Sequence, residues 1–185
     1  MAKYTDKMLV IDLEATCWDE NSPQPKGEES EIIEVGICSM SRQNAEKHWT
    51  IIGSESILIK PIKSKISRFC TSLTTLTQAQ VDKGVTLFEA CRRLEAVYDS
   101  PHVPWASWGD YDRKMFEKSC KGVVRYPFGP THWNMKDFYS LMTKLDREVG
   151  MAEALKLEGI PLSGTHHRGV DDAYNVGKIL EKILP

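Results

Sequence analysis

Two carboxylates near the N-terminus have types and spacing that could do chemistry. Asp12 and Glu14 stand two positions apart in the apolar run 9–14, which predicts a buried β-strand. Side chains alternate between the two faces of a strand, so both acids share one face, roughly 6 to 7 Å apart. Two unpaired buried carboxylates would repel each other and take up protons, whereas a divalent cation compensates both charges. The pair therefore predicts a metal site. The alternative is that the strand ends here and both acids reach water.

A second pair of acids opens a predicted helix over residues 110–120. Helical spacing places Asp112 on an apolar stripe with Met115, Phe116 and Cys120, so Asp112 is predicted to face the core. Asp110 shares its face with charged residues. It is predicted to be an N-cap that accepts hydrogen bonds from free backbone N–H groups.

The last predicted helix, residues 169–184, repeats this division. Asp172 is in phase with Val176, Ile179 and Ile183, whereas Asp171 is in phase with polar residues. Four acids are thus predicted to lie beside apolar surface, which proteins rarely tolerate without cationic partners: Asp12, Glu14, Asp112 and Asp172. Their convergence on one metal site is a hypothesis.

Two adjacent histidines precede that helix. His167 lies five residues before Asp172 on a loop that contains glycine, where it could act as a general base over the metal site. His166 is the competing candidate, and spacing alone does not choose between them.

Strands come first along the chain and then alternate with helices. Residues 21–29 read as a loop, 31–40 and 50–59 as strands joined by a turn at 42–44, and a capping box, Thr86-x-x-Glu89, opens a helix over 86–99. Short strands at 103–108 and 129–135 alternate with helices at 110–120, from 136, from 150 and at 169–184. This order predicts an α/β fold. Its first three strands would be antiparallel, and the later two parallel to the first by crossover connections.

Composition describes an ordinary globular chain. With 185 residues, of which 41% are hydrophobic and 27% charged, one domain over 1–185 is expected. The five cysteines are widely spaced without a C-x-x-C pair, which argues against disulfides and zinc. No apolar run is long enough to span a membrane, and the expected location is cytoplasmic.

A net charge of −2 argues against a broad basic surface for long duplex nucleic acid. The densest basic stretch, residues 60–68, is followed by Phe69. It could line a groove that follows a nucleic-acid backbone, with Phe69 as a stacking platform, or it could be a solvated loop.

Three ordered motifs resemble those of the DEDDh 3′-to-5′ exonucleases: Asp12-Leu13-Glu14-Ala15-Thr16-Cys17, then Tyr111-Asp112 with Phe116, then His167-x-x-x-x-Asp172. Within that superfamily the chain is most similar to the Eri-type exoribonucleases. Their second block is matched by Lys60-Pro61, Phe69-Cys70, Ser72-Leu73-Thr74, Thr77-Gln78 and Gln80-Val81-Asp82. The resemblance covers nearly the whole chain.

The resemblance implies a ribonuclease H-like, mixed five-stranded sheet flanked by helices. It also implies hydrolysis of single-stranded RNA or DNA from the 3′ end, with release of nucleoside 5′-monophosphates. The four acids would hold two Mg²⁺ or Mn²⁺ ions, and no stably bound organic cofactor is expected. Asp12 would bridge both ions, Glu14 and Asp172 would complete the ion that binds the attacking water, and Asp112 would help to hold the other.

By motif position, Asp112 rather than Asp110 and His167 rather than His166 correspond to the catalytic residues. The same match makes Ala15, Thr16, Phe69 and Tyr111 candidates for substrate binding. Tyr111 stands where related sequences often have tryptophan, and core packing is the alternative for both aromatic rings.

The sequence leaves two other functions open. One is a DNA-directed exonuclease of the same superfamily, which recognition of the ribose 2′-OH would distinguish. The other is a non-catalytic RNA-binding module, although such a module has no need to gather this many acids.

Overall fold

The computed structural model describes residues 6–42 and 48–184. Of the turn expected at 42–44, Gln43 and Asn44 lie outside the described residues. The described chain forms a sheet with strand order β3-β2-β1-β4-β5. The strands are β1 (Lys7–Ala15), β2 (Ile32–Arg42), β3 (Trp49–Leu58), β4 (Trp105–Ser107) and β5 (His132–Asn134).

Strand directions agree with the sequence prediction. β1 pairs antiparallel with β2 and β2 with β3, whereas β4 is parallel to both β1 and β5. The ladder between β1 and β4 is short, because only Leu9 with Trp105 and Val10 with Ala106 are in register. The mixed, helix-flanked sheet predicted from the sequence is therefore confirmed.

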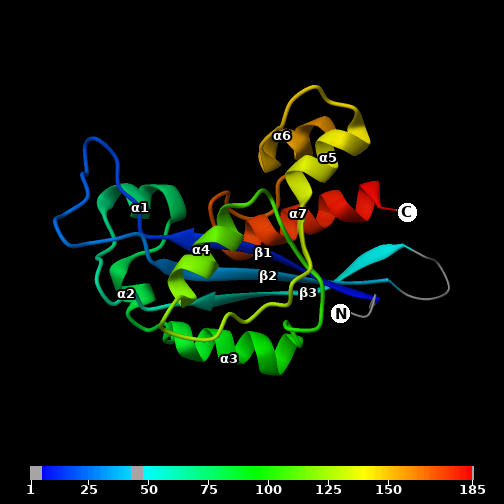
Figure 1. Cartoon of the computed structure of the whole chain (residues 1–185). Helices are drawn as coiled ribbons and strands as arrows, with labels where there is room; N and C mark the ends of the chain where they lie inside the picture. The colour runs from blue at the N-terminus through cyan, green and yellow to red at the C-terminus, as the bar shows by residue number, and fades with distance from the viewer. Residues whose placement is uncertain (1–5, 43–47, 185) are drawn as a thin grey trace.

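Helices cover both faces of the sheet, and Figure 1 shows α3 and α7 on opposite sides of it. One core contains apolar residues of α3 and α4 packed on β1 to β3, and the other contains residues of α5, α6 and α7. Alternation along β1 supplies both cores, with Leu9, Ile11 and Leu13 on one face and Met8 and Val10 on the other. The helices are α1 (Arg68–Thr74), α2 (Gln78–Val81), α3 (Leu87–Tyr98), α4 (Tyr111–Cys120), α5 (Met135–Thr143), α6 (Met151–Leu157) and α7 (Gly169–Ile183).

Local signals set most helix boundaries. The predicted capping box at α3 is present, since the Thr86 hydroxyl accepts a hydrogen bond from the backbone N–H of Glu89 and the Glu89 carboxylate accepts one from the backbone N–H of Thr86. The sequence prediction missed the short helices α1 and α2, which pack through Cys70 and Val81 onto a small separate core. All five cysteines are free, and only Cys17 is partly exposed.

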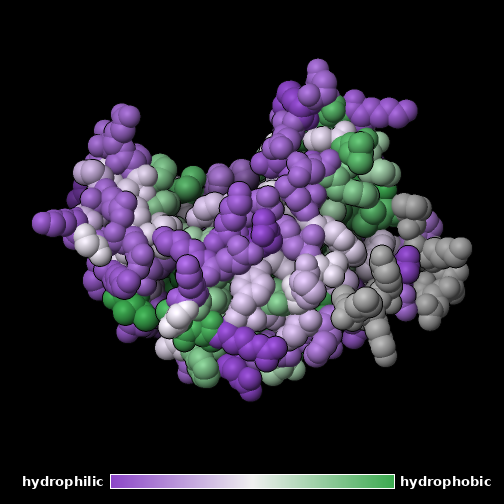
Figure 2. Space-filling view, viewed as in Figure 1, coloured by the Kyte–Doolittle hydropathy of each residue, from purple (hydrophilic) through white to green (hydrophobic). Residues whose placement is uncertain are grey.

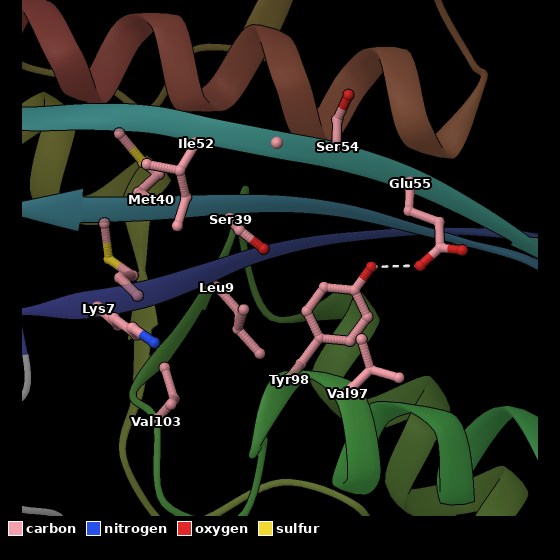
Figure 3. Close-up of a pocket in the computed structure, with 12 residues that line it drawn as sticks. Lys7, Leu9, Ser39, Met40, Ile52, Ser54, Glu55, Val97, Tyr98 and Val103 are labelled. Carbon is pink, nitrogen blue, oxygen red and sulfur yellow. Dashed lines mark hydrogen bonds between the residues drawn. The ribbon is translucent and has the colours of Figure 1, made fainter.

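A cavity of about 500 Å³ lies between the C-terminal end of α3 and strands β1 to β3 (Figure 3). Its lining includes Leu9, Val103 and Tyr98, whose hydroxyl donates a hydrogen bond to Glu55. None of the four predicted metal-binding acids and neither histidine lines it. This cavity therefore contains none of the residues predicted to be catalytic.

A membrane-spanning helix is not found among residues 6–42 and 48–184, because none of their helices combines the necessary length and apolar character.

Candidate active site

A cleft of about 470 Å³ collects the predicted catalytic residues. Figure 2 shows the surface hollowed between the lobe that carries α1 and the lobe formed by α5 and α6. The four acids and both histidines line the cleft: Asp12, Glu14, Asp112, His166, His167 and Asp172. Five segments far apart in the sequence meet here, namely the end of β1, helix α1, and the starts of α4, α6 and α7.

Strand β1 supplies Asp12 and Glu14. Leu9, Ile11 and Leu13 fill the core on one side, so the alternating residues Asp12 and Glu14 point to the other, where α7 lies. Glu14 is only 8% exposed, and Asp12 is partly exposed.

Helix α4 supplies Asp112, whose side chain is buried. Met115, Phe116 and Cys120 are buried with it, as the apolar stripe predicts. The Asp112 carboxylate accepts a hydrogen bond of 2.9 Å from the backbone N–H of Leu13. This bond fastens the start of α4 to β1 beside the other two acids.

The prediction for Asp110 is wrong in one respect. Asp110 is the N-cap residue of α4, but its side chain makes no capping hydrogen bond. Its backbone is helical (φ −104°, ψ −3°) rather than extended, the conformation in which an N-cap side chain reaches the N–H groups of the first turn. The carboxylate instead lies 3.4 Å from the Arg113 guanidinium.

Helix α7 supplies Asp172 in its first turn. The approach of this helix to the sheet depends on two glycines, because a Cβ on Gly36 would lie 1.9 Å from the carbonyl group of Gly169. Gly36 is the register partner of Asp12 on β1. The close contact therefore sets the start of α7, and with it Asp172, against the strand that carries the other acids.

Carboxylate oxygens of Asp12, Glu14 and Asp172 lie within 4.8 Å of one another. Burial and mutual repulsion raise the pKa of Glu14 to about 9 and hold the pKa of Asp12 well above its usual range. Burial also raises the pKa of Asp112, to about 6, and that of Asp172. The raised pKa values show that the negative charges of this cluster lack compensation, which a bound cation would supply. Because all the ligands are carboxylate oxygens, the cluster fits hard divalent cations.

The two histidines play different structural parts. Their rings stack at a centroid separation of 3.9 Å. His166 places Nδ1 3.0 Å from the Asp172 carboxylate, whereas His167 donates its backbone N–H to the same carboxylate at 2.9 Å. His167 adopts a left-handed backbone (φ 65°), which is uncommon for a residue with a side chain. Burial lowers the pKa of the His167 imidazole, which favours its neutral form.

The four expected substrate contacts divide into two pairs. Ala15 and Tyr111 line the cleft. Thr16 is buried behind it, where its hydroxyl donates to the carbonyl of Glu29 and accepts from the backbone N–H of Glu31. Phe69 belongs to α1, but Leu73 is the residue of that helix that lines the cleft. The structure thus places Thr16 and Phe69 outside the cleft lining.

Sequence reasoning missed a buried ion pair next to the site. Arg168 places Nε 3.0 Å and Nη2 3.3 Å from the two carboxylate oxygens of Glu34, which is fully buried. Glu34 also accepts hydrogen bonds from the hydroxyl of Ser56 and the backbone N–H of Gly169. The only sequence signal was an acid inside the apolar run 32–35, and nothing in the sequence identified its partner. The pair fixes the loop that carries both histidines.

Comparison with known proteins agrees with this geometry. A family model described as Exonuclease (RNase_T) matches residues 9–180. The 3′-5′ exonuclease Snipper of Drosophila melanogaster is 26% identical over 96% of this chain and 69% of its own length. Human 3′-5′ exoribonuclease 1 is 27% identical over 98% of this chain, which spans 53% of that protein.

A solved structure shows the same similarity in three dimensions. The nuclease domain of 3′hExo, a DEDDh family member bound to rAMP, superposes with a TM-score of 0.82 at 26% identity. The match covers 100% of this chain and 94% of that domain. Because the family model spans nearly the whole sequence and the site holds the four acids of the motif, the chain belongs to the metal-dependent exonuclease family of DEDDh 3′-to-5′ exonucleases.

Proposed function

We propose that this 3′-to-5′ exonuclease shortens single-stranded RNA, releasing nucleoside 5′-monophosphates with the help of two Mg²⁺ or Mn²⁺ ions. The observation that carries the proposal is the meeting of Asp12, Glu14 and Asp172 within 4.8 Å, with Asp112 in the same cleft. RNA is favoured over DNA because relatives with 26–27% identity include exoribonucleases, a domain bound to rAMP, and an exonuclease that recognises a histone mRNA stem-loop.

The acids divide the work of holding the ions. Asp12, Glu14 and Asp172 are close enough to share one cation, and Asp112, which lines the same cleft, would help to hold the second. Asp12 lines the cleft together with Asp112 as well as with Glu14 and Asp172, so it would be available as a ligand to either ion. When bound, a pair of divalent ions stabilises the attacking and leaving oxygens of an in-line displacement at phosphorus.

The histidine loop supplies proton transfer. The proposed general base is the His167 imidazole, which takes a proton from the attacking water. Its lowered pKa keeps the ring neutral, and therefore able to accept a proton, near neutral pH. His166 orients the Asp172 carboxylate through its Nδ1 contact. Tyr111 and Ala15 are proposed to contact the terminal nucleotide from the cleft wall.

The test is incubation with 5′-labelled single-stranded RNA and DNA of one sequence, with Mg²⁺ or with a chelator. We expect an RNA ladder that shortens from the 3′ end and disappears with the chelator. Faster degradation of the DNA would show that DNA, and not RNA, is the preferred substrate. Oligonucleotide binding without any metal-dependent product would refute the proposed activity.

A further inference from the structure

A second hollow of about 340 Å³ lies beside the cleft and is lined by lysines from two segments. Lys60 and Lys63 follow β3, whereas Lys118 and Lys121 lie at the C-terminal end of α4. We call this the lysine hollow. It contains part of the basic stretch 60–68, which the proposed catalytic site does not use.

The charges that line the lysine hollow do not cancel. Glu31 accepts hydrogen bonds from the backbone N–H groups of Ile62, Lys63 and Ser64, so its carboxylate shapes the loop. Glu29 pairs with Lys63 at 2.5 Å and lies 3.9 Å from Lys118.

Lys60 and Lys121 form no ion pair with any residue in 6–42 or 48–184. Both are exposed, and both line the hollow. The four lysines therefore face two glutamates, which leaves a local positive excess on a chain whose net charge is −2. Such an excess attracts an anion with several charges.

The lysine hollow adjoins the cleft directly. Ser30 lines the hollow, and its hydroxyl donates a hydrogen bond of 3.0 Å to the carbonyl of Thr16, which stands between two residues of the cleft lining, Ala15 and Cys17. Helix α4 connects the two as well, because it begins at Tyr111 and carries Lys118 in its last turn. At ~1.5 Å per residue these two positions are about 10 Å apart along the helix axis. Figure 1 shows α4 running from the region of the cleft toward α3.

We propose that the lysine hollow binds the phosphate backbone of the substrate strand, on the 5′ side of the nucleotide held in the cleft. The inference rests on the proposed function, since it assigns a contact to a strand whose 3′ end is being removed. The backbone of such a strand carries one negative charge per nucleotide and is continuous from the cleft. Lys60 and Lys121 supply unpaired ammonium groups where that backbone leaves the active site. These contacts read no base sequence and would favour long over short substrates.

The test compares the variant Lys60→Gln/Lys121→Gln with the matched control Lys144→Gln/Lys156→Gln. The control removes two exposed lysines that line neither the cleft nor the hollow. Each protein is assayed on a long single-stranded oligonucleotide and on a trinucleotide, over a range of salt concentrations. Each lysine–phosphate contact on a single strand contributes ~0.7 to the slope of log affinity against log salt, so two contacts contribute about 1.4.

Between 1 M salt, where such contacts contribute little, and 0.1 M salt, a slope of about 1.4 corresponds to roughly a 25-fold change in affinity. We therefore expect the hollow variant to raise KM for the long oligonucleotide about 25-fold and to lower its salt slope by about 1.4, with kcat unchanged. KM for the trinucleotide stays as in the unmodified protein, and the control keeps all four values.

Unchanged KM and salt slope on the long oligonucleotide would overturn the inference, and so would an equal loss on the trinucleotide. Binding of the labelled long oligonucleotide in the presence of chelator provides a readout without turnover. Absence of 3′ shortening by the unmodified protein would refute the proposed function alone. Equal oligonucleotide binding by the hollow variant and the control would refute only the proposal that the lysine hollow binds the substrate backbone.

Discussion

The buried pair between Glu34 and Arg168 predicts an unusually large effect of one substitution beside the active site. Arg168→Met keeps much of the apolar stem but removes the guanidinium. It leaves Glu34, which is fully buried, with only a hydroxyl and a backbone N–H as donors. Removal of one partner from a buried ion pair costs ~3–5 kcal/mol, because the remaining charge is neither paired nor hydrated. For a chain of this length, ~2–4 °C of Tm accompany each kcal/mol, so we expect Tm to fall by about 6 to 20 °C.

The two partners should not be equivalent. Glu34→Gln leaves Arg168, whose side chain is 23% exposed and can reach water, so we expect a smaller loss than for Arg168→Met. The double variant Glu34→Gln/Arg168→Met should be more stable than Arg168→Met alone, because it removes the stranded charge. Thermal unfolding of the four proteins in one buffer measures these differences.

A surface pair serves as the control for this double-mutant cycle. Arg147 and Glu153 lie 2.5 Å apart with side chains that are 61% and 41% exposed, so Arg147→Met should cost no more than ~1 kcal/mol. If Arg168→Met were as mild as Arg147→Met, or if the double variant were no better than Arg168→Met, the argument from the buried charge would be wrong.

Four further predictions address the cleft and the loop behind it. Asp12→Asn should abolish turnover, because it removes a metal ligand. The circular dichroism spectrum should stay native, because the substitution also removes a charge that repels the neighbouring acids. Normal activity of this variant would contradict the metal site. In metal-free protein the pKa of Glu14 is raised from 4.5 to about 9, so the folded state binds more protons than the unfolded state. The free energy of unfolding should therefore fall as pH rises through that window, and Mg²⁺ should flatten the fall measured by urea titration. His167→Ala should lower kcat about 10²- to 10⁴-fold, the usual contribution of a general base, and an equal or larger loss in His166→Ala would reassign the base. Thr16→Val should lower the free energy of unfolding by about 1–3 kcal/mol, because the N–H of Glu31 loses its acceptor, with KM unchanged; a raised KM at native stability would instead support the prediction that Thr16 contacts the substrate.

The sequence predicted those features that depend on local periodicity. Alternation along β1 placed Asp12 and Glu14 on one face, and helical phase separated the buried Asp112 and Asp172 from their neighbours Asp110 and Asp171. The fold class followed from the order of strands and helices. The predictions for the acids succeeded because each depends on residues within one or two turns of the chain, and the fold class succeeded because it needs only the order of such locally recognised elements.

The features that the sequence did not predict depend on contacts between distant segments. Glu34 and Arg168 are 134 positions apart, and each taken alone resembles an isolated charge. The different roles of His166 and His167 depend on the left-handed backbone at His167, which neighbouring residue types do not specify. Thr16 was assigned to the substrate by its motif position, but its side chain satisfies the loop at Glu29 and Glu31.

The short ladder between β1 and β4 has a consequence for how the enzyme could evolve. β1 and β4 are not paired beyond Val10 and Ala106, and the backbone N–H of Leu13, further along β1, donates to Asp112 instead of to a neighbouring strand. If β4 were longer and paired with β1 beyond Val10, it would compete with the Asp112 carboxylate for the backbone N–H of Leu13. The sheet thus lacks further pairing between β1 and β4 at its centre, and Asp112 uses the unpaired amide of Leu13 to hold the start of α4 beside Asp12 and Glu14.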